Sequence, residues 1–178
     1  VKPTYRLSLL MALACLLIAP LPLQVHLGHP ERAFSIFMTP NSSSAMAMFG
    51  FIYVWYLMAV LLVEIWLDYR REIVGWSKTE PFWPKRLFYK LLTFGVDNVS
   101  PRSLAIDDKC GRALTVIGLP SAVLLHGYVG FIFGSIKANP WWSTPLMPVI
   151  FLFSAMASGI AGVLLTYMFL CWVRDEPI

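Results

Sequence analysis

One stretch decides the fold: residues 146–173 read LMPVIFLFSAMASGIAGVLLTYMFLCWV, without a single charged side chain. A helix needs about 20 predominantly apolar residues to cross the hydrocarbon core of a bilayer. Because this stretch is longer than that and carries no charge, it predicts a transmembrane helix at 146–173.

Three further apolar stretches precede it and predict transmembrane helices at about 7–25, 45–69 and 113–136. Pro20 and Pro22 stand near the end of the first and should kink or end that helix, since proline removes a backbone donor. The sequence therefore predicts an all-α fold, a polytopic transmembrane bundle of four helices that forms a single membrane domain over 1–178.

The composition agrees, because 58% of the residues are hydrophobic and only 13% are charged, too few to cover a soluble domain. The surplus apolar surface identifies the lipid bilayer as a partner. The net charge of +4 lies between the apolar stretches and forms no groove-facing patch, so nucleic acid is excluded as a partner.

The positive charges fix the expected orientation, since cytoplasmic loops are enriched in Lys and Arg. With four helices, both chain ends and the middle loop share one side, and the two short loops share the other. The first side carries Lys2, Arg6, Arg70, Arg71, Lys78, Lys85, Arg86, Lys90, Arg102, Lys109, Arg112 and Arg174, and the other only Arg32 and Lys137. We therefore expect a cytoplasmic loop at 70–112 and short loops that face outward.

The loop at 70–112 has one ordered candidate, a short helix that opens at Pro84. It would carry Leu87, Phe88, Leu91 and Leu92 on one face and Lys85, Arg86, Tyr89 and Lys90 toward the other, as in helices that lie on anionic headgroups. The alternative is a solvated basic loop.

Ionisable groups inside a membrane are candidates for function, because burying them without a partner is expensive. Glu64 and Asp68 lie one helical turn apart near the cytoplasmic end of the second helix, and Arg71 follows. They predict a proton path from the cytoplasm. The alternative is an interfacial cluster that Arg70, Arg71 or a loop lysine neutralises.

His126 lies in the third helix near its outer end, and Tyr128 follows two residues later. An imidazole there could bind a quinone carbonyl or pass a proton, or could be a packed residue of the bundle. The histidines are poorly matched for bis-histidine haem, and the three cysteines are too scattered for an iron–sulfur cluster. We expect neither haem, nor an iron–sulfur cluster, nor a bound metal ion in this chain.

The two outward loops carry polar and aromatic side chains that could form a docking surface or the mouth of a ligand site. They are His26, His29, Glu31 and Arg32 in the first loop, and Trp141 and Trp142 in the second. Tryptophan pairs at this level are also common as interface anchors.

Two segments resemble the NrfD/polysulfide reductase membrane-subunit family, most of all its HybB/DsrP-like branch. They are LGHPERAF at 27–34 with the TPN at 39–41, and LLHGYVGFIFGSIKANPWWSTPLMPVIFLFSAMASGIAG at 124–162. The family's first motif more often reads LGRPER after an acid; here His29 takes the place of the arginine and His26 that of the acid. The resemblance covers nearly this whole chain but only part of a family member, so we expect further helices in a longer protein.

The resemblance implies a haem-free subunit that exchanges electrons between membrane quinone, such as menaquinone, and a ferredoxin-like iron–sulfur subunit of a larger respiratory complex. It also implies the prokaryotic inner membrane. On this reading His126, Tyr128, His26, Arg32 and Trp142 are the quinone candidates, and Glu64 and Asp68 form the proton path. Docking of the partner falls to His29, Glu31, Arg32 and Trp141.

Two alternatives stay open at this point. One is a purely structural anchor for the iron–sulfur subunit, without a quinone site of its own. Half of a transporter is the weaker one, because no predicted helix is broken by an unwound Gly/Pro segment at its centre.

Overall fold

A computed structural model describes residues 2–26, 28–39 and 41–175, and all regular structure in that part of the chain is helical. The segments in chain order are α1 (Lys2–Ile18), α2 (Pro20–His26), the 3-10 turn η1 (Pro30–Arg32), α3 (Ser35–Met38), α4 (Ala45–Val54), the π-helix η2 (Trp55–Leu61), α5 (Leu62–Thr79), α6 (Trp83–Leu92), α7 (Pro101–Gly134) and α8 (Met147–Val173). Four stretches are long and apolar enough to cross a membrane: Thr4–Pro22, Ala45–Thr79, Pro101–Gly134 and Met147–Val173. The predicted all-α bundle of four membrane-spanning helices is confirmed.

The first span is interrupted where its prolines begin. α1 ends at Ile18, and α2 opens directly on Pro20 after the single residue Ala19. A proline cannot donate the backbone hydrogen bond that would continue α1, which explains the break. The helix predicted at 7–25 is therefore two segments, and the first of them begins earlier than expected.

The charged middle loop is shorter than predicted, because both helices that border it extend into it. α5 continues to Thr79 and α7 begins at Pro101, so the connection is 80–100 and not 70–112. Ser100 caps α7, accepting a hydrogen bond on its side chain from the Ser103 amide at 3.4 Å, and Pro101 suits the first helical position. The change to polar residues marks where a helix leaves the membrane, but the helix itself continues until a capping residue ends it.

The short helix expected after Pro84 is α6, which lies beside α5. It ends in a left-handed turn, where Phe94 and Gly95 have φ angles of 48° and 75°. Glycine adopts such angles without strain, which explains its place after the helix.

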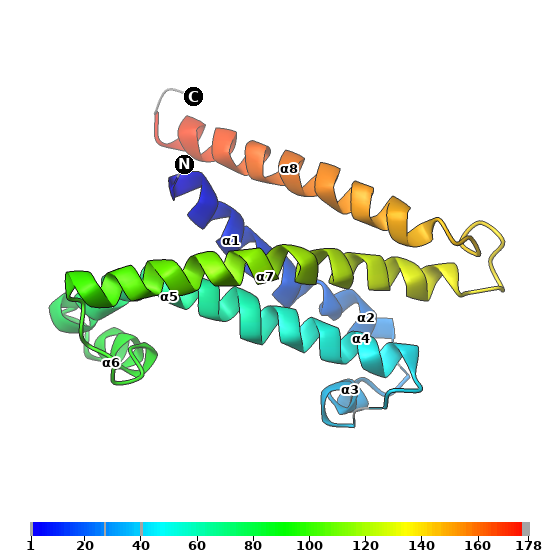
Figure 1. Ribbon diagram of the computed structural model, residues 1–178, viewed down its shortest axis with the longest axis horizontal. Coiled ribbons are helices and arrows are strands. Elements are labelled where there is room, and N and C mark those ends of the chain that lie inside the picture. Colours follow the sequence, from blue (N-terminus) through cyan, green and yellow to red (C-terminus); the bar gives the residue numbers. More distant parts are fainter. Residues whose placement is uncertain (1, 27, 40, 176–178) are drawn as a thin grey trace.

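The bundle has two distinct ends (Figure 1). The start of α1, the end of α8 and α6 lie at one end, which we call the α6 end. α3 and the loop from α7 to α8 lie at the opposite end, which we call the short-loop end. α7 is the central element, in contact with α4, η2, α5 and α8.

Glycines permit the close approach of α7 to the start of α8. A Cβ atom on Gly130 would lie 2.6 Å from the Cα of Pro148, and one on Gly134 would lie 2.8 Å from the Thr144 carbonyl oxygen. These distances are shorter than any tolerable contact, so the absence of side chains sets this helix crossing.

The interior is small, and most of the apolar surface faces outward. Ile52, Tyr53 and Leu125 form a buried cluster between α4 and α7. In contrast, Phe153 and Leu165 on α8 remain 65% and 67% exposed. Such an outward apolar surface fits a chain surrounded by lipid or by further membrane helices.

Candidate functional site

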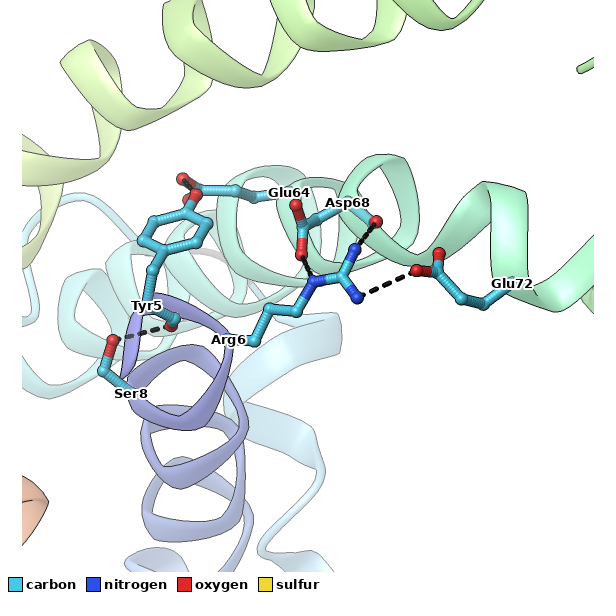
Figure 2. A network of polar contacts seen from close by, with 6 residues as sticks. All are labelled: Tyr5, Arg6, Ser8, Glu64, Asp68 and Glu72. Atoms are coloured by element: carbon cyan, nitrogen blue, oxygen red, sulfur yellow. Dashed lines mark hydrogen bonds and ion pairs between the residues drawn. The ribbon is translucent and has the colours of Figure 1, made fainter. Parts of the chain in front are cut away.

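Arg6 at the start of α1 joins the first span to the acidic face of α5 (Figure 2). Its Nε lies 2.6 Å from Oδ2 of Asp68, and its two terminal nitrogens donate to Glu72 Oε1 at 2.9 Å and to the Asp68 carbonyl oxygen at 2.8 Å. One guanidinium thus neutralises two carboxylates one turn apart on the same helix face. The alternative reading expected neutralisation by Arg70, Arg71 or a loop lysine; the cation found is Arg6, whereas Arg70 pairs elsewhere and Arg71 is exposed.

Glu64 lies one turn further into the bundle and is buried, with 6% of its surface exposed. Its Oε1 accepts hydrogen bonds from the Tyr5 hydroxyl at 2.6 Å and from the Thr115 hydroxyl at 2.5 Å. The two donors come from α1 and α7, so three spans meet at this carboxyl group. In Figure 2 the Tyr5 ring points toward Glu64, beside the Arg6 cluster.

A cavity of about 270 Å³ opens onto this group between α1, α5 and α7. Its lining is rich in ionisable side chains, Tyr5, Glu64, Asp68, Asp107, Asp108 and Arg112, and also includes Leu67, Gly111 and Thr115. The cavity is large enough for several water molecules, and its polar walls would hold them by hydrogen bonds. The arrangement can therefore hold and transfer protons next to Glu64.

Arg70 makes a second, more deeply buried ion pair beside the cavity. Its terminal nitrogens donate to Asp107 Oδ1 at 2.5 Å, to the Ser103 hydroxyl at 2.7 Å and to the Asn98 carbonyl oxygen. Only 5% and 8% of the Arg70 and Asp107 side chains are exposed. The pair ties α5 to the start of α7 and to the loop before it.

The short-loop end holds a second cavity, of about 340 Å³, where α7 meets the start of α8. Its walls are mostly apolar with a few hydroxyl groups: Phe131, Gly134, Ser135, Ser143, Thr144, Pro145 and Pro148. Trp142 stands close by, packed edge-on against Phe133 with ring centroids 5.4 Å apart. A mostly apolar cavity of this volume with a few polar groups has the character of a small-molecule site.

His126 and Tyr128 point to different partners on α7. The Nδ1 of His126 lies 2.9 Å from the Ala122 carbonyl oxygen, whereas the Tyr128 hydroxyl donates to the Ala45 carbonyl oxygen at 3.0 Å. Helical periodicity places His126 on the same side of α7 as Gly130, one turn away, which is the side that meets α8. Tyr128 packs against the buried cluster of α4 and α7 instead.

The remaining predicted residues lie on the loops of the short-loop end. His29 and Glu31 pair at 2.9 Å on the surface, Arg32 closes η1 and is exposed, and Trp141 is 89% exposed. Among the described residues, no hydrogen bond, ion pair or ring contact joins the two loops. The side chain of His26, at the end of α2, falls outside the described part of the chain.

We call the cavity beside Glu64, with the neighbouring Arg6 and Arg70 ion pairs, the inner site. Sequence reasoning missed Tyr5, Arg6, Thr115 and Asp107 as parts of it. The signal for the first two was weak but present, since a tyrosine and an arginine side by side at the start of an apolar stretch suit an interfacial polar contact. Nothing in the sequence around Thr115 and Asp107 indicated a role. Only the packing of α5 against α7 brings Thr115 to Glu64 and Asp107 to Arg70. In the part of the chain that the structure describes, no group of three or more His, Cys, Asp or Glu side chains could hold a metal ion.

Fold and sites together define a helical membrane protein that has ionisable groups at one end and an aromatic, hydroxyl-lined cavity at the other. The chain belongs to the family described as Polysulphide reductase, NrfD, whose family model matches residues 1–177. This confirms the family resemblance inferred from the sequence.

Two relatives show how this chain compares with longer members of the family. It is similar to a subunit of the selenate reductase of Mesobacillus selenatarsenatis, with 34% identity over 92% of this chain and 39% of that protein. It is also similar to protein NrfD of Escherichia coli, with 25% identity over 90% of this chain and 46% of that protein. The chain thus spans less than half the length of either relative. No solved structure matches it.

Proposed function

We propose that this chain is the quinone-reactive membrane subunit of a respiratory reductase in the inner membrane of a prokaryote. The observation that carries the proposal is the cavity of about 340 Å³ at the short-loop end, which combines the Phe131 ring with the hydroxyls of Ser135 and Thr144. A quinone ring needs apolar walls for its body and a few polar groups for its two oxygens. The family suits this reading, because its named members include a subunit of a selenate reductase.

We take quinol as the bound form, because the relative named as a selenate reductase subunit belongs to a complex that consumes electrons. Quinol oxidation releases two electrons and two protons, so a proton acceptor must stand near the ring. The Ala122 carbonyl can only accept a hydrogen bond, so Nδ1 of His126 carries the hydrogen in that contact, and in a neutral ring Nε2 is left as an acceptor. His126 does not line this cavity but lies on the same α8-facing side of α7, and it is proposed to accept one hydroxyl proton of quinol through an intervening water, with Trp142 at the mouth of the cavity. Tyr128, already bonded to Ala45, takes a structural part.

The two electrons would pass to an iron–sulfur subunit docked on the short-loop end. The exposed pair His29 and Glu31, the exposed Arg32 and the 89% exposed Trp141 supply charges and an aromatic anchor for that contact. Aromatic and arginine side chains are typical anchors of protein interfaces.

The inner site supports a second role for the same subunit, the uptake of protons from the α6 end for transfer across the membrane, driven by quinol oxidation. Glu64 is buried, held by two hydroxyls, and borders a cavity with four carboxyl groups. A carboxyl group with such neighbours can change its protonation without a large movement. The charge asymmetry of the sequence predicts that this end faces the cytoplasm, and Asp68 would form the outer step of the path.

A photoreactive menaquinone analogue, bound to the purified full-length complex, tests the proposal. Cross-links mapped by mass spectrometry should fall on 131–135 and 142–148, and excess unlabelled quinone should remove them. The end of α8, 165–173, is the matched control segment, because it is as apolar but lies at the α6 end. Cross-links confined to other subunits would instead favour the purely structural anchor.

A further inference from the structure

Helix α6 uses only one of its faces to pack against the rest of the chain. The Tyr89 ring packs against Trp76 with centroids 5.4 Å apart, and the Leu92 carbonyl accepts a hydrogen bond of 2.7 Å from the Trp66 indole. Both tryptophans belong to α5, so α6 is fixed beside the end of a membrane span. Tryptophan and tyrosine side chains gather where the bilayer meets water, which sets the depth of α6 at that boundary.

A second face of α6 is apolar and uncovered. Leu87, Phe88 and Leu91 are 44%, 58% and 66% exposed, and Trp83 at the start of the helix is 72% exposed. Helical spacing places Leu87, Phe88 and Leu91 on one side, away from Tyr89. At the boundary of a bilayer this side can enter the acyl region, where its exposure costs nothing.

All charged side chains of α6 are cationic: Arg86 and Lys90 lie one turn apart on the side between Tyr89 and the apolar face, and Lys85 lies one turn before Tyr89. Lys85, Arg86 and Lys90 are all exposed, and α6 has no acidic residue. None of these three side chains makes a hydrogen bond or an ion pair with another described residue. Three unpaired cations on one short helix are the charge complement of a layer of phosphate groups.

We propose that α6 is a lipid-binding element whose cations bind the phosphate groups of anionic phospholipids while its apolar face enters the bilayer. Arg86 and Lys90, one turn apart, and Lys85 beside the Tyr89 side supply the phosphate-binding cations, and Leu87, Phe88 and Leu91 hold the helix at the correct depth. The site lies at the opposite end from the quinone cavity, so this function is independent of quinone chemistry.

Lipid retention by the full-length protein measures this site. The protein is incubated in equimolar phosphatidylglycerol and phosphatidylcholine, and native mass spectrometry counts the lipids of each kind that remain bound. The wild type should favour phosphatidylglycerol, and the triple variant Lys85→Gln/Arg86→Gln/Lys90→Gln should lose that preference by about tenfold or more. The matched control Arg71→Gln/Arg102→Gln/Lys109→Gln removes the same charge from exposed positions on α5 and α7, and should keep it.

Equal losses in the two triple variants would overturn the proposal, because diffuse charge would then explain the preference. If the α6 variant keeps the preference for phosphatidylglycerol, the proposal is also overturned. The same holds if the α6 variant retains lipid but no longer binds an acidic soluble subunit, because the cations would then serve a protein partner. Salt gives a test that needs no mutation. Raising the ionic strength to about 1 M shortens the screening length to about 3 Å and should weaken the wild-type preference; an unchanged preference would count against the cationic surface.

Discussion

The guanidinium of Arg70 and the carboxylate of Asp107 meet at 2.5 Å while both side chains are more than nine-tenths buried. Removal of one partner would leave the other charge buried without compensation, which typically costs about 3–5 kcal/mol. We expect Asp107→Asn and Arg70→Met each to lower the free energy of unfolding by about that amount, measured by denaturation in detergent. The double variant should lose much less than the sum. Arg102→Met, at an exposed position, is the control; single losses as small as its own would show that the pair does not hold α5 to α7.

Glu64→Gln tests the inner site. Glutamine keeps an oxygen for the Tyr5 and Thr115 hydroxyls but cannot take up a proton, so stability should change by less than about 1.5 kcal/mol. Quinone-linked proton uptake in vesicles, followed with a pH-sensitive dye, should fall at least about tenfold. Glu72→Gln is the control, since Glu72 binds Arg6 and does not line the cavity. Undiminished uptake in Glu64→Gln would make Glu64 a structural tie between three spans.

His126→Leu tests the quinone site, because leucine keeps bulk and removes both ring nitrogens. Quinol-linked turnover of the complex should slow by roughly three- to tenfold, the worth of one hydrogen bond of about 0.5–1.5 kcal/mol. Electron transfer from a soluble donor to the iron–sulfur subunit should be unchanged. Tyr128→Phe, which removes the bond to Ala45, should affect stability and leave turnover intact. Intact quinol turnover in His126→Leu would identify the histidine as a packing residue.

Gly130→Ala should separate α7 from the start of α8. The added Cβ would meet the backbone of Pro148 at 2.6 Å, which no side-chain rotation can relieve. We expect a loss of stability of about 1–3 kcal/mol, as for other overpacked positions. Gly159→Ala on α8 is the matched control, since its Cβ would meet nothing within 4 Å. A tolerant Gly130→Ala would show that this crossing can adjust.

Reporter fusions test the orientation. The positive charges at the α6 end predict a cytoplasmic signal from a fusion after Lys90 and an outside signal from one after Asn139. The opposite pattern would reverse the direction proposed for proton uptake and the side proposed for partner docking.

The spans could be predicted because a helix that crosses the lipid must be long and apolar, and such stretches are visible in the sequence without any knowledge of tertiary contacts. Their ends were not, because capping by Ser100 and the left-handed turn at Gly95 decide them locally. The inner site was half predictable. Glu64 and Asp68 are conspicuous in an apolar stretch, whereas the partners Tyr5, Arg6 and Thr115 are distant in sequence and come together only through helix packing.

The π-helix Trp55–Leu61 divides the second span into two parts, whose side chains are rotated relative to each other around the helix axis. Each of its hydrogen bonds encloses one residue more than an α-helical bond, and one extra residue turns everything beyond it by about 100°. A single helical wheel drawn from Ala45 to Thr79 would thus assign Glu64 to the wrong neighbours. Deletion of one residue within the π-helix would restore a uniform spiral and swing Glu64 away from Tyr5 and Thr115. The contacts of Glu64 therefore depend on an irregularity of the backbone, the π-helix, and not on the identity of any single side chain in this span.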